Sequence, residues 1–427
     1  MSRLERWLER RSDASITAFA IAAAFTAYFC MYAFRKPFAA APYEGDLAGT
    51  GVALKTSYVV AQLVGYTLSK FLGTKFNAEL EAHSRRGALL GLVGFSWISL
   101  WLLALLPADA GMVALFLNGL PLGMVWGVVV SCLEGRRSSE LMLAGLSCSY
   151  ILASGAVKDV GRALLGAGVP EVWMPAAVGA LFVVPYGISV YGLTALPPPT
   201  AQDVALRSAR TTMDSQARWS FLRQYASVLI PLICVYTALT AIRDFRDNYG
   251  AELFIELGLG DTPGVFSASE LPVALAVVLA MGLLAYIQDN ARALMVVYGL
   301  MVGGVLTVGG ATFALQQGWI GGLSWMIWIG IGSYVAYVPF GSMLFERLFA
   351  YTRATGTAVF AIYLADALGY SGSIVLQLVR DWMQADSQLV FFSSALLWST
   401  ALAPALLAVS AVALRRTSPQ PTGAASP

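Results

Sequence analysis

The sequence predicts an all-α integral membrane protein with twelve transmembrane helices in two pseudo-symmetric six-helix halves. Of its 427 residues, 58% are hydrophobic and only 12% are charged, and the mean hydropathy is +0.68. A soluble chain of this length could not remove so much apolar surface from water. The charged residues gather between long apolar stretches, which is typical of a chain that crosses a membrane many times.

Twelve apolar stretches are each long enough to cross a hydrocarbon layer of about 30 Å as a helix. They lie near residues 14–41, 51–73, 87–106, 110–133, 140–165, 172–195, 224–247, 266–287, 292–315, 320–345, 355–379 and 390–413. Residues 196–223 differ, because prolines and alternating charges replace the apolar run. We therefore expect an N-terminal half at 1–195, a cytoplasmic linker at 196–223, and a C-terminal half at 224–427 that ends in a short disordered tail.

Basic residues mark one set of loops and so predict the orientation of the chain. This set holds the N-terminus, Lys75, Arg85, Arg86, Arg136, Arg137, the linker, Arg292, Arg347, Arg353, Arg415 and Arg416. The opposite loops carry acids such as Glu44, Asp109 and Glu256. We expect a multi-pass protein of the cytoplasmic (inner) membrane with both termini in the cytoplasm and the first helix retained.

Composition and motifs argue against several function classes. A net charge of +2 gives no basis for a nucleic-acid partner. The four cysteines form no CxxC pair and the only histidine, His83, lies in a polar loop, so we expect no metal and no cofactor. The chain has no HExxH, no GxSxG and no paired acids at catalytic spacing on one helix, so we do not expect an enzyme.

The two halves show similar motifs. In each half a glycine, Gly119 or Gly330, precedes an acid, Glu134 or Glu346, and another glycine opens the next stretch. The glycine-to-acid and acid-to-glycine spacings agree within one residue between the halves. A six-plus-six duplication is typical of secondary transporters, whose substrate site lies between the halves near the bilayer midplane. The alternative is that such glycine and arginine patterns are common to all polytopic proteins.

Arg35 lies inside the first apolar stretch and Arg243 inside the seventh. A cation near the centre of a membrane helix costs about 2.5–3.5 kcal/mol or more, so it is expected to face water, a partner or a ligand. A guanidinium binds phosphate or carboxylate through two parallel hydrogen bonds, so the two arginines are predicted to hold an anionic substrate. The alternative for Arg35 is snorkelling, because it lies roughly 9 Å inside the helix end.

Other intramembrane polar residues add to this hypothesis. Lys70 lies late in the second stretch, where it either contributes to substrate binding or snorkels. Tyr150, Ser154 and Lys158 share one face of the fifth stretch. This face either lines the substrate cavity or belongs to a structural ion cluster in which Asp159 pairs with Arg162.

Several charges are predicted to couple or brace the helices. Asp366 is the lone acid of the eleventh stretch, and it either pairs with a cation such as Lys158 or titrates as a proton site. Lys36 is expected to form a structural ion pair, Arg246 to pair near Asp244 and Asp247, and Glu270 to bind an arginine or lie at the surface. Five residues at cytoplasmic helix ends are predicted to form gating ion pairs, with solvated helix ends as the alternative: Glu134, Arg136, Arg137, Glu346 and Arg347.

Two sequence blocks resemble the organophosphate:phosphate antiporter branch of the major facilitator superfamily, which includes the glycerol-3-phosphate and hexose-6-phosphate transporters. These blocks are Tyr32-x-x-Arg35-Lys36-x-Phe38 and Phe116-Leu-Asn118-Gly119-x-x-x-Gly123-Met124-x-Trp126. Further agreement comes from Ser69-Lys70-Phe71, Cys148-x-Tyr150, Tyr236, Arg243, Gly356-Thr357-Ala358 and Leu368-Gly369-Tyr370. The resemblance implies the major facilitator fold and a phosphoryl grip by Arg35 and Arg243, with Tyr32, Lys70, Tyr150 and Lys158 as further candidates for substrate contact.

The sequence also departs from this branch. Tyr150 stands where the glycerol-3-phosphate transporter has a histidine, and Asn77 stands near the usual loop aspartate. Lys158, Asp159, Arg162 and Asp366 are added charges. We therefore expect a divergent relative.

The sequence as a whole predicts a secondary active transporter of a small organic anion, with phosphorylated solutes among the candidates. It would work by alternating access and exchange, as a monomer in a lipid bilayer. One alternative is a proton-coupled carrier of a carboxylate or another solute, with Asp366 as the coupling acid. The other is a non-transporting membrane sensor of a similar ligand.

Overall fold

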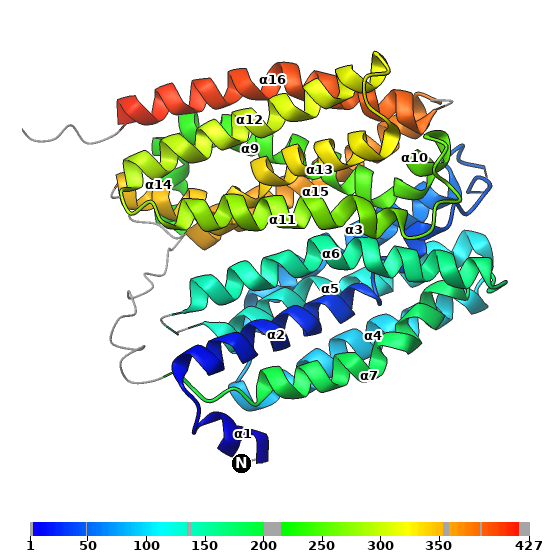
Figure 1. Ribbon diagram of the computed structural model, residues 1–427, viewed down its shortest axis with the longest axis horizontal. Coiled ribbons are helices and arrows are strands. Elements are labelled where there is room, and N and C mark those ends of the chain that lie inside the picture. The colour runs from blue at the N-terminus through cyan, green and yellow to red at the C-terminus, as the bar shows by residue number, and fades with distance from the viewer. Residues whose placement is uncertain are drawn as a thin grey trace, which may run out of the picture. The chain divides into compact units, whose positions relative to one another are not determined.

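The computed structural model describes residues 3–47, 49–134, 136, 138–199, 215–352, 358–384 and 387–417, and these are almost entirely helical (Figure 1). Helices in the first part are α1 (Arg3–Leu8), α2 (Asp13–Tyr32), η1 (Pro37–Ala40), α3 (Leu54–Glu79), η2 (Ala82–Ser84), α4 (Arg85–Leu105), η3 (Ala108–Ala110), α5 (Gly111–Leu133), α6 (Ser139–Gly166) and α7 (Met174–Thr194). Those in the second part are α9 (Ser215–Asn248), α10 (Gly250–Glu256), α11 (Val265–Ala285), α12 (Asn290–Gln316), α13 (Gly322–Pro339), the π-helix η4 (Phe340–Leu344), α14 (Phe345–Thr352), α15 (Ala358–Trp382) and α16 (Gln388–Thr417).

Twelve of the described helices have 18 residues or more, one for each expected span: α2 to α7, α9, α11, α12, α13, α15 and α16. Nine helical stretches in the described part of the chain are also apolar enough by composition to cross a membrane. The other three, α3, α6 and α15, carry the intramembrane charges considered above, including Lys70, Lys158 and Asp366. The all-helical fold class is therefore confirmed.

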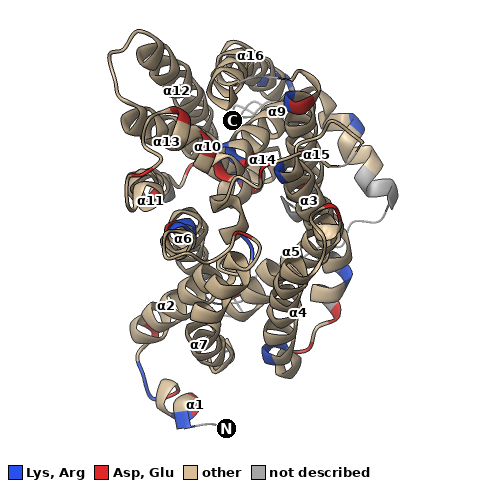
Figure 2. Ribbon diagram, turned by 90° about the vertical axis from the view of Figure 1, so that its right-hand side faces the viewer, with Lys and Arg blue, Asp and Glu red and all other residues tan. Residues whose placement is uncertain are grey.

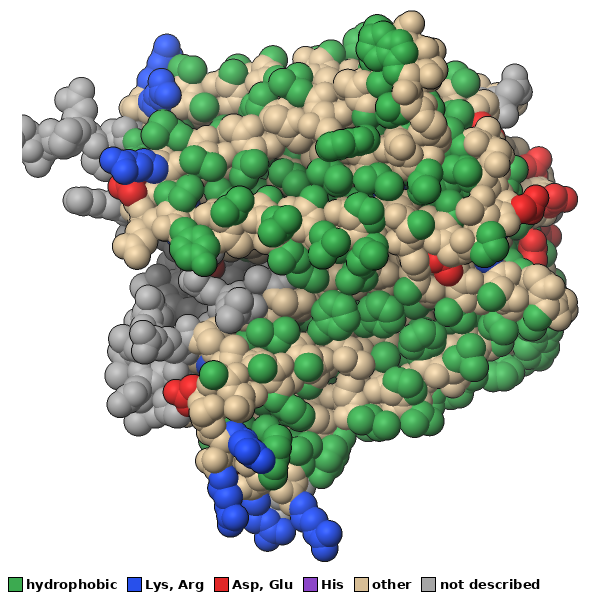
Figure 3. Space-filling view, viewed as in Figure 1, with side chains coloured by type: hydrophobic (Ala, Val, Ile, Leu, Met, Phe, Trp, Pro, Cys, Tyr) green, Lys and Arg blue, Asp and Glu red, His purple; other side chains and the backbone are tan. Residues whose placement is uncertain are grey.

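Hydrophobic side chains cover the helices on the face drawn in Figure 3, with basic and acidic side chains toward their ends. Many large apolar residues are exposed, among them Ile98, Leu105, Ile188, Leu283 and Trp398. Figure 2, which views the helices from their ends, shows acidic residues in α10. Such an apolar exterior is what a lipid environment requires.

Helix boundaries differ from the expected bounds of the first span and of the linker. The first span was expected to continue to residue 41, but α2 ends at Tyr32, and a short 3-10 helix follows from Pro37. A proline has no N–H and cannot continue the helical hydrogen-bond ladder, which explains this break. α9 begins at Ser215, inside the expected linker, and its Phe221 stacks on Phe349 with ring centroids 4.7 Å apart. Residues 200–214 of that linker and the expected tail at 418–427 lie outside the described residues.

The chain forms two compact units. Unit 1 contains Met1–Ser208, Phe245–Ala274 and Ile374–Leu389, and unit 2 contains Ala209–Asp244, Leu275–Ser373 and Val390–Pro427. Unit 1 therefore includes the six helices α2 to α7, the helix α10, and one end each of α9, α11 and α15. The expected division of the sequence into two repeated halves, residues 1–195 and 224–427, stays a prediction.

In unit 1, α2 packs on α6 and α7, α4 packs on α5 and α7, and α3 packs closely on α5 (Figure 1). Glycines permit the close contact between α3 and α5. A Cβ added to Gly65 would overlap the backbone carbonyl of Phe116, and one added to Gly119 would overlap that of Gln62. Small residues let helix backbones approach in this way, and the approach brings Gln62 beside Asn118.

In unit 2, an apolar core joins α9, α12, α13, α14 and α16. Its fully buried members include Val228, Leu232, Val235, Val297, Met301 and Leu407. The backbones of α12 and α13 meet at Gly304 and Gly332, where a Cβ on either glycine would overlap the other residue's carbonyl. This core places α13, which carries Tyr337, next to α9, which carries Arg243.

Candidate functional site

Arg35 lies at a break in the first membrane helix. The N–H groups of Arg35 and Lys36 both donate to the carbonyl of Tyr32, at 3.0 and 2.9 Å, which closes α2 in a tight turn. Beyond this turn the helical ladder is not continued, because Pro37 has no N–H and the N–H of Ala39 donates to the carbonyl of Lys36 instead of that of Arg35. A break at membrane depth requires other donors for the carbonyls of Phe34 and Arg35.

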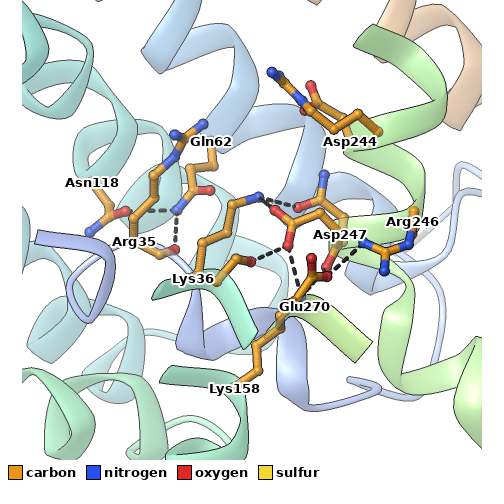
Figure 4. A network of polar contacts seen from close by, with 12 residues as sticks. Arg35, Lys36, Gln62, Asn118, Lys158, Asp244, Arg246, Asp247 and Glu270 are labelled. Atoms are coloured by element: carbon orange, nitrogen blue, oxygen red, sulfur yellow. Dashed lines mark hydrogen bonds and ion pairs between the residues drawn. The ribbon is translucent and has the colours of Figure 1, made fainter. Parts of the chain in front are cut away.

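Side chains from three neighbouring helices supply those donors, and two of them, Gln62 and Asn118, are shown in Figure 4. Gln62 Nε2 donates to the Arg35 carbonyl at 2.9 Å, and Asn118 Nδ2 donates to the Phe34 carbonyl at 2.9 Å. Ser96 Oγ donates to the Phe34 carbonyl at 3.3 Å. The broken backbone is therefore tied to α3, α4 and α5.

The guanidinium of Arg35 lies against the ring of Tyr66. Its carbon Cζ is 3.8 Å from the centre of that ring and 5.9 Å from the centre of the Tyr32 ring. Lys70 Nζ lies 5.4 Å from the centre of the same Tyr66 ring. One phenol ring thus faces two cations, an arrangement that aromatic rings favour through their negative faces.

Gln62, Tyr66 and Lys70 follow one another at four-residue intervals, so they share one face of α3. Sequence reasoning selected Lys70 from this face and missed Gln62 and Tyr66. The i, i+4 spacing back from Lys70 was the signal that would have found them.

Aromatic rings connect Tyr32 to Tyr150. The ring of Tyr28 lies 5.7 Å from that of Tyr32 and 5.0 Å from that of Trp126, and Trp126 lies 6.2 Å from Tyr150, all between ring centroids. Two residues predicted to contact substrate, Tyr32 and Tyr150, therefore belong to one row of rings across α2, α5 and α6. Their role in binding stays a prediction.

A second cluster in unit 1 is centred on Asp247, near the end of α9 (Figure 4). One carboxylate oxygen lies 2.5 Å from Lys36 Nζ, and the other lies 2.7 Å from Lys158 Nζ. Ser154 donates its hydroxyl to the same carboxylate, and Lys36 also donates to Asn248 Oδ1 at 2.8 Å. Lys36 and Lys158 are only 3% and 1% exposed, so two buried lysines share one carboxylate.

These contacts decide several expectations. Lys36 forms the expected ion pair, and Ser154 and Lys158 meet the same acid. Arg246 was expected to pair near Asp244 and Asp247, but its carboxylate partner is Glu270, at 2.6 Å. Of the two alternatives for Glu270, the arginine partner is therefore confirmed.

The alternative in which Asp159 pairs with Arg162 differs from the contacts that the structure describes for these two residues. Asp159 instead accepts hydrogen bonds from the backbone N–H groups of Phe266 and Ser267, at 3.2 and 2.7 Å. Arg162 donates to the carbonyl of Gly260. The N–H groups at the start of a helix attract a carboxylate, and Asp159 therefore binds the start of α11 and not Arg162.

Arg243 lies in unit 2 and is held by Asp244. Its Nη2 and Nε lie 2.8 and 3.1 Å from Asp244 Oδ1, and its Cζ is 4.3 Å from the centre of the Tyr337 ring. The hydroxyls of Tyr337 and Tyr236 are 3.0 Å apart, and Tyr236 donates to Asp366. An arginine, two phenols and a carboxylate are thus linked in one chain of contacts.

Two of the residues predicted to gate transport, Arg136 and Arg347, have hydrogen bonds to nearby backbone or side-chain oxygens. Arg136 donates to the carbonyl of Pro197, and Arg347 donates to the carbonyl of Gln288 and to Asn290 Oδ1, at 3.1 and 2.9 Å. Glu134 follows the end of α5 and Glu346 lies in the first turn of α14, whereas Arg137 lies outside the described residues. The gating role of all five residues stays a prediction. Within the described part of the chain, no group of three His, Cys, Asp or Glu side chains could hold a metal ion.

Comparison with known proteins agrees with this architecture. A family described as a family of unknown function (DUF5690) matches residues 37–417. The nucleoside transporter NupG superposes with a TM-score of 0.60 at 14% identity, over 94% of this chain and 99% of its own. A D-xylose-proton symporter superposes with a TM-score of 0.59 at 13% identity, over 91% of this chain and 96% of its own. A peptide transporter POT in complex with sulfate superposes with a TM-score of 0.59 at 15% identity, over 94% of this chain and 95% of its own. A search of curated proteins gives no significant match.

At these identities, the structural likeness shows the fold alone. All three neighbours have the major facilitator fold, so the expected fold of this chain is confirmed. The resemblance to the organophosphate branch in particular has no support among the comparisons and stays a hypothesis.

Proposed function

The chain belongs to the family of unknown function DUF5690 and has the major facilitator fold, and from this premise we propose that it is a secondary transporter of a small organic anion. The observation that carries the proposal is the group formed by Arg35, Lys70 and Tyr66, in which two cations face one phenol ring inside membrane helices. Cations at such depth are costly and are retained for function. Three structural neighbours are a nucleoside transporter, a D-xylose-proton symporter and a peptide transporter, which supports the same class of activity.

The chemistry of this group favours an anion with a planar or tetrahedral oxygen array. The guanidinium of Arg35 offers paired N–H donors that match carboxylate and phosphate, and it stays charged in a dry site. The ammonium of Lys70 adds positive potential at the same ring. The resemblance of the Arg35 and Asn118 blocks to the organophosphate branch makes phosphorylated solutes the first compounds to test.

Exchange is the proposed mode of transport. A carrier that closes around uncompensated buried cations meets a large free-energy cost, whereas one that closes around a bound anion does not. The return step is therefore faster when a second anion is bound. Arg243 is proposed as a second anion contact, and substrate would have to displace Asp244 from it. The proposed location is the cytoplasmic membrane with both termini inside, and the bilayer and the anion are the only partners required.

The test is a binding screen of phosphorylated and carboxylated metabolites against purified protein, followed by counterflow in proteoliposomes. Arg35→Ala should weaken binding by at least about thirtyfold, because losing one partner of a desolvated charge pair costs about 2 kcal/mol or more. Arg86→Ala is the matched control, since Arg86 also lies over a tyrosine ring, 4.8 Å from the centre of Tyr191. Equal binding by wild type and Arg35→Ala would refute the proposal, and binding without counterflow would favour a sensor.

A second candidate is a proton-coupled carrier with Asp366 as the coupling acid. The observation in its favour is the contact chain from Asp366 through Tyr236 and Tyr337 to Arg243, which connects a carboxylate to a proposed anion contact. Asp366→Asn discriminates between the two. It should abolish the pH dependence of uptake if protons drive transport, and leave counterflow nearly unchanged if the protein exchanges anions.

A further inference from the structure

We infer that Gln62 and Asn118 are positioning residues for the anion site: they fix the broken backbone at Phe34 and Arg35 so that the Arg35 guanidinium stays on the Tyr66 ring. This inference rests on the proposed function, because it concerns how the binding arginine is held. The relevant contacts can be followed in Figure 4.

The N–H groups of both amides, which are the groups that could donate to an anion, are already used within the protein. Gln62 Nε2 donates to the Arg35 carbonyl at 2.9 Å and to Asn118 Oδ1 at 2.8 Å, which engages both of its N–H groups. Asn118 Nδ2 contacts the Phe34 carbonyl and the carbonyl of Ser96, both at 2.9 Å, and Ser96 Oγ at 2.6 Å. Neither amide has an N–H group left for a ligand, so their effect on binding must pass through Arg35.

Their burial makes these contacts strong determinants of the local geometry. Asn118 is fully buried, and Gln62 is 2% exposed. Buried carbonyls without donors are costly, and most of all inside a membrane, where water cannot replace the missing partner. The backbone between Phe34 and Arg35 is therefore expected to move when either amide is removed.

The geometry also connects backbone and side chain. Gln62 holds the carbonyl of Arg35, and Tyr66, one turn further along α3, holds its guanidinium. Both ends of Arg35 thus rest on one face of a single helix. A shift of the Arg35 Cα changes the direction of its side chain, and displacements of about 1 Å at a binding group can cost as much as a hundredfold in function.

The experiment measures binding of inorganic phosphate, and counterflow of phosphate, for wild type, Gln62→Met and Asn118→Leu. We expect the dissociation constant to rise about tenfold or more, with the exchange rate at saturating phosphate changed less than about threefold. The matched control is Thr56→Val, on the same helix, which removes a buried hydrogen bond of 2.7 Å to the Tyr249 hydroxyl. It should change the dissociation constant by less than about twofold while lowering the melting temperature to a similar degree.

A second background separates positioning from general destabilisation. In Arg35→Lys, the flexible ammonium no longer depends on the backbone direction in the same way, so adding Gln62→Met should weaken binding by less than about twofold. An equal loss in both backgrounds, or a loss no larger than that of Thr56→Val, would overturn the inference.

Ser96→Ala is the milder variant if the amide variants fail to accumulate. It removes the hydroxyl that donates to the Phe34 carbonyl and should raise the dissociation constant about two- to fivefold, whereas no change would overturn the inference. If wild type binds neither inorganic phosphate nor any anion of the screen, the proposed function fails and the inference fails with it. If wild type binds and the Gln62→Met, Asn118→Leu and Ser96→Ala variants bind equally well, only the inference fails.

Discussion

Asp247→Asn should destabilise the protein far more than removal of either lysine that contacts Asp247. The carboxylate holds Lys36 at 2.5 Å and Lys158 at 2.7 Å, and both lysines are almost completely buried. Without the negative charge, two ammonium groups remain in a dry environment and repel each other. Removing one partner of a buried ion pair costs about 3–5 kcal/mol, and we expect at least this loss.

Lys158→Met should have a much smaller effect. The carboxylate keeps Lys36 and the Ser154 hydroxyl as partners, and the methionine side chain fills a similar volume against Phe266, whose ring centre lies 5.0 Å from Lys158 Nζ. Replacing a buried charge by a well-packed apolar group is often close to neutral while the remaining charges stay balanced. We expect a change within about 1.5 kcal/mol.

The double variant follows from the same reasoning. In Asp247→Asn, the second mutation Lys158→Met removes one of the two uncompensated cations. The double variant should therefore be more stable than the sum of the single effects predicts, by about 1–3 kcal/mol.

Reversible unfolding in mixed detergent micelles measures these differences as free energies. Glu44→Gln is the control, because Glu44 is an exposed acid in the loop before α3, and it should change stability by less than about 0.5 kcal/mol. The reasoning is refuted if Lys158→Met costs as much as Asp247→Asn, or if the two effects are additive.

Three further predictions concern binding, topology and packing. Tyr66→Leu should weaken anion binding about three- to thirtyfold in an equilibrium binding assay, whereas Tyr66→Phe, which keeps the ring, should stay within about twofold. Cysteines placed at Arg11 and at Asp261, both exposed, should react with a membrane-impermeant maleimide from opposite sides of sealed vesicles, and labelling from one side would contradict the proposed topology. Gly119→Val should abolish accumulation of folded protein, because its Cβ would overlap the α3 backbone, while Gly87→Val, which has open space around it, should be tolerated in a fluorescence size-exclusion assay.

The sequence by itself determined the membrane class and the number of long helices, and it singled out Arg35 as a candidate for substrate binding. These features depend on local properties, namely the length of apolar runs and the cost of a charge within them. Even the break after Tyr32 was available locally, since Pro37 cannot continue a helix, although the expected span passed over it. The face of α3 that carries Gln62 and Tyr66 was likewise readable from its four-residue spacing to Lys70.

Only the tertiary structure decided which charges meet. Lys158 and Asp247 are 89 residues apart, and their pairing depends on the depth and rotation of two helices, which no local pattern fixes. Local reasoning gave Asp159 to Arg162 because they are neighbours on one helix, but the N–H groups at the start of α11 bind that carboxylate instead. The same holds for Gln62 and Asn118, whose role exists only because the α3 and α5 backbones approach closely at the broken segment beside Arg35. Hydropathy places a side chain in the membrane, but its partner is set by how the helices pack.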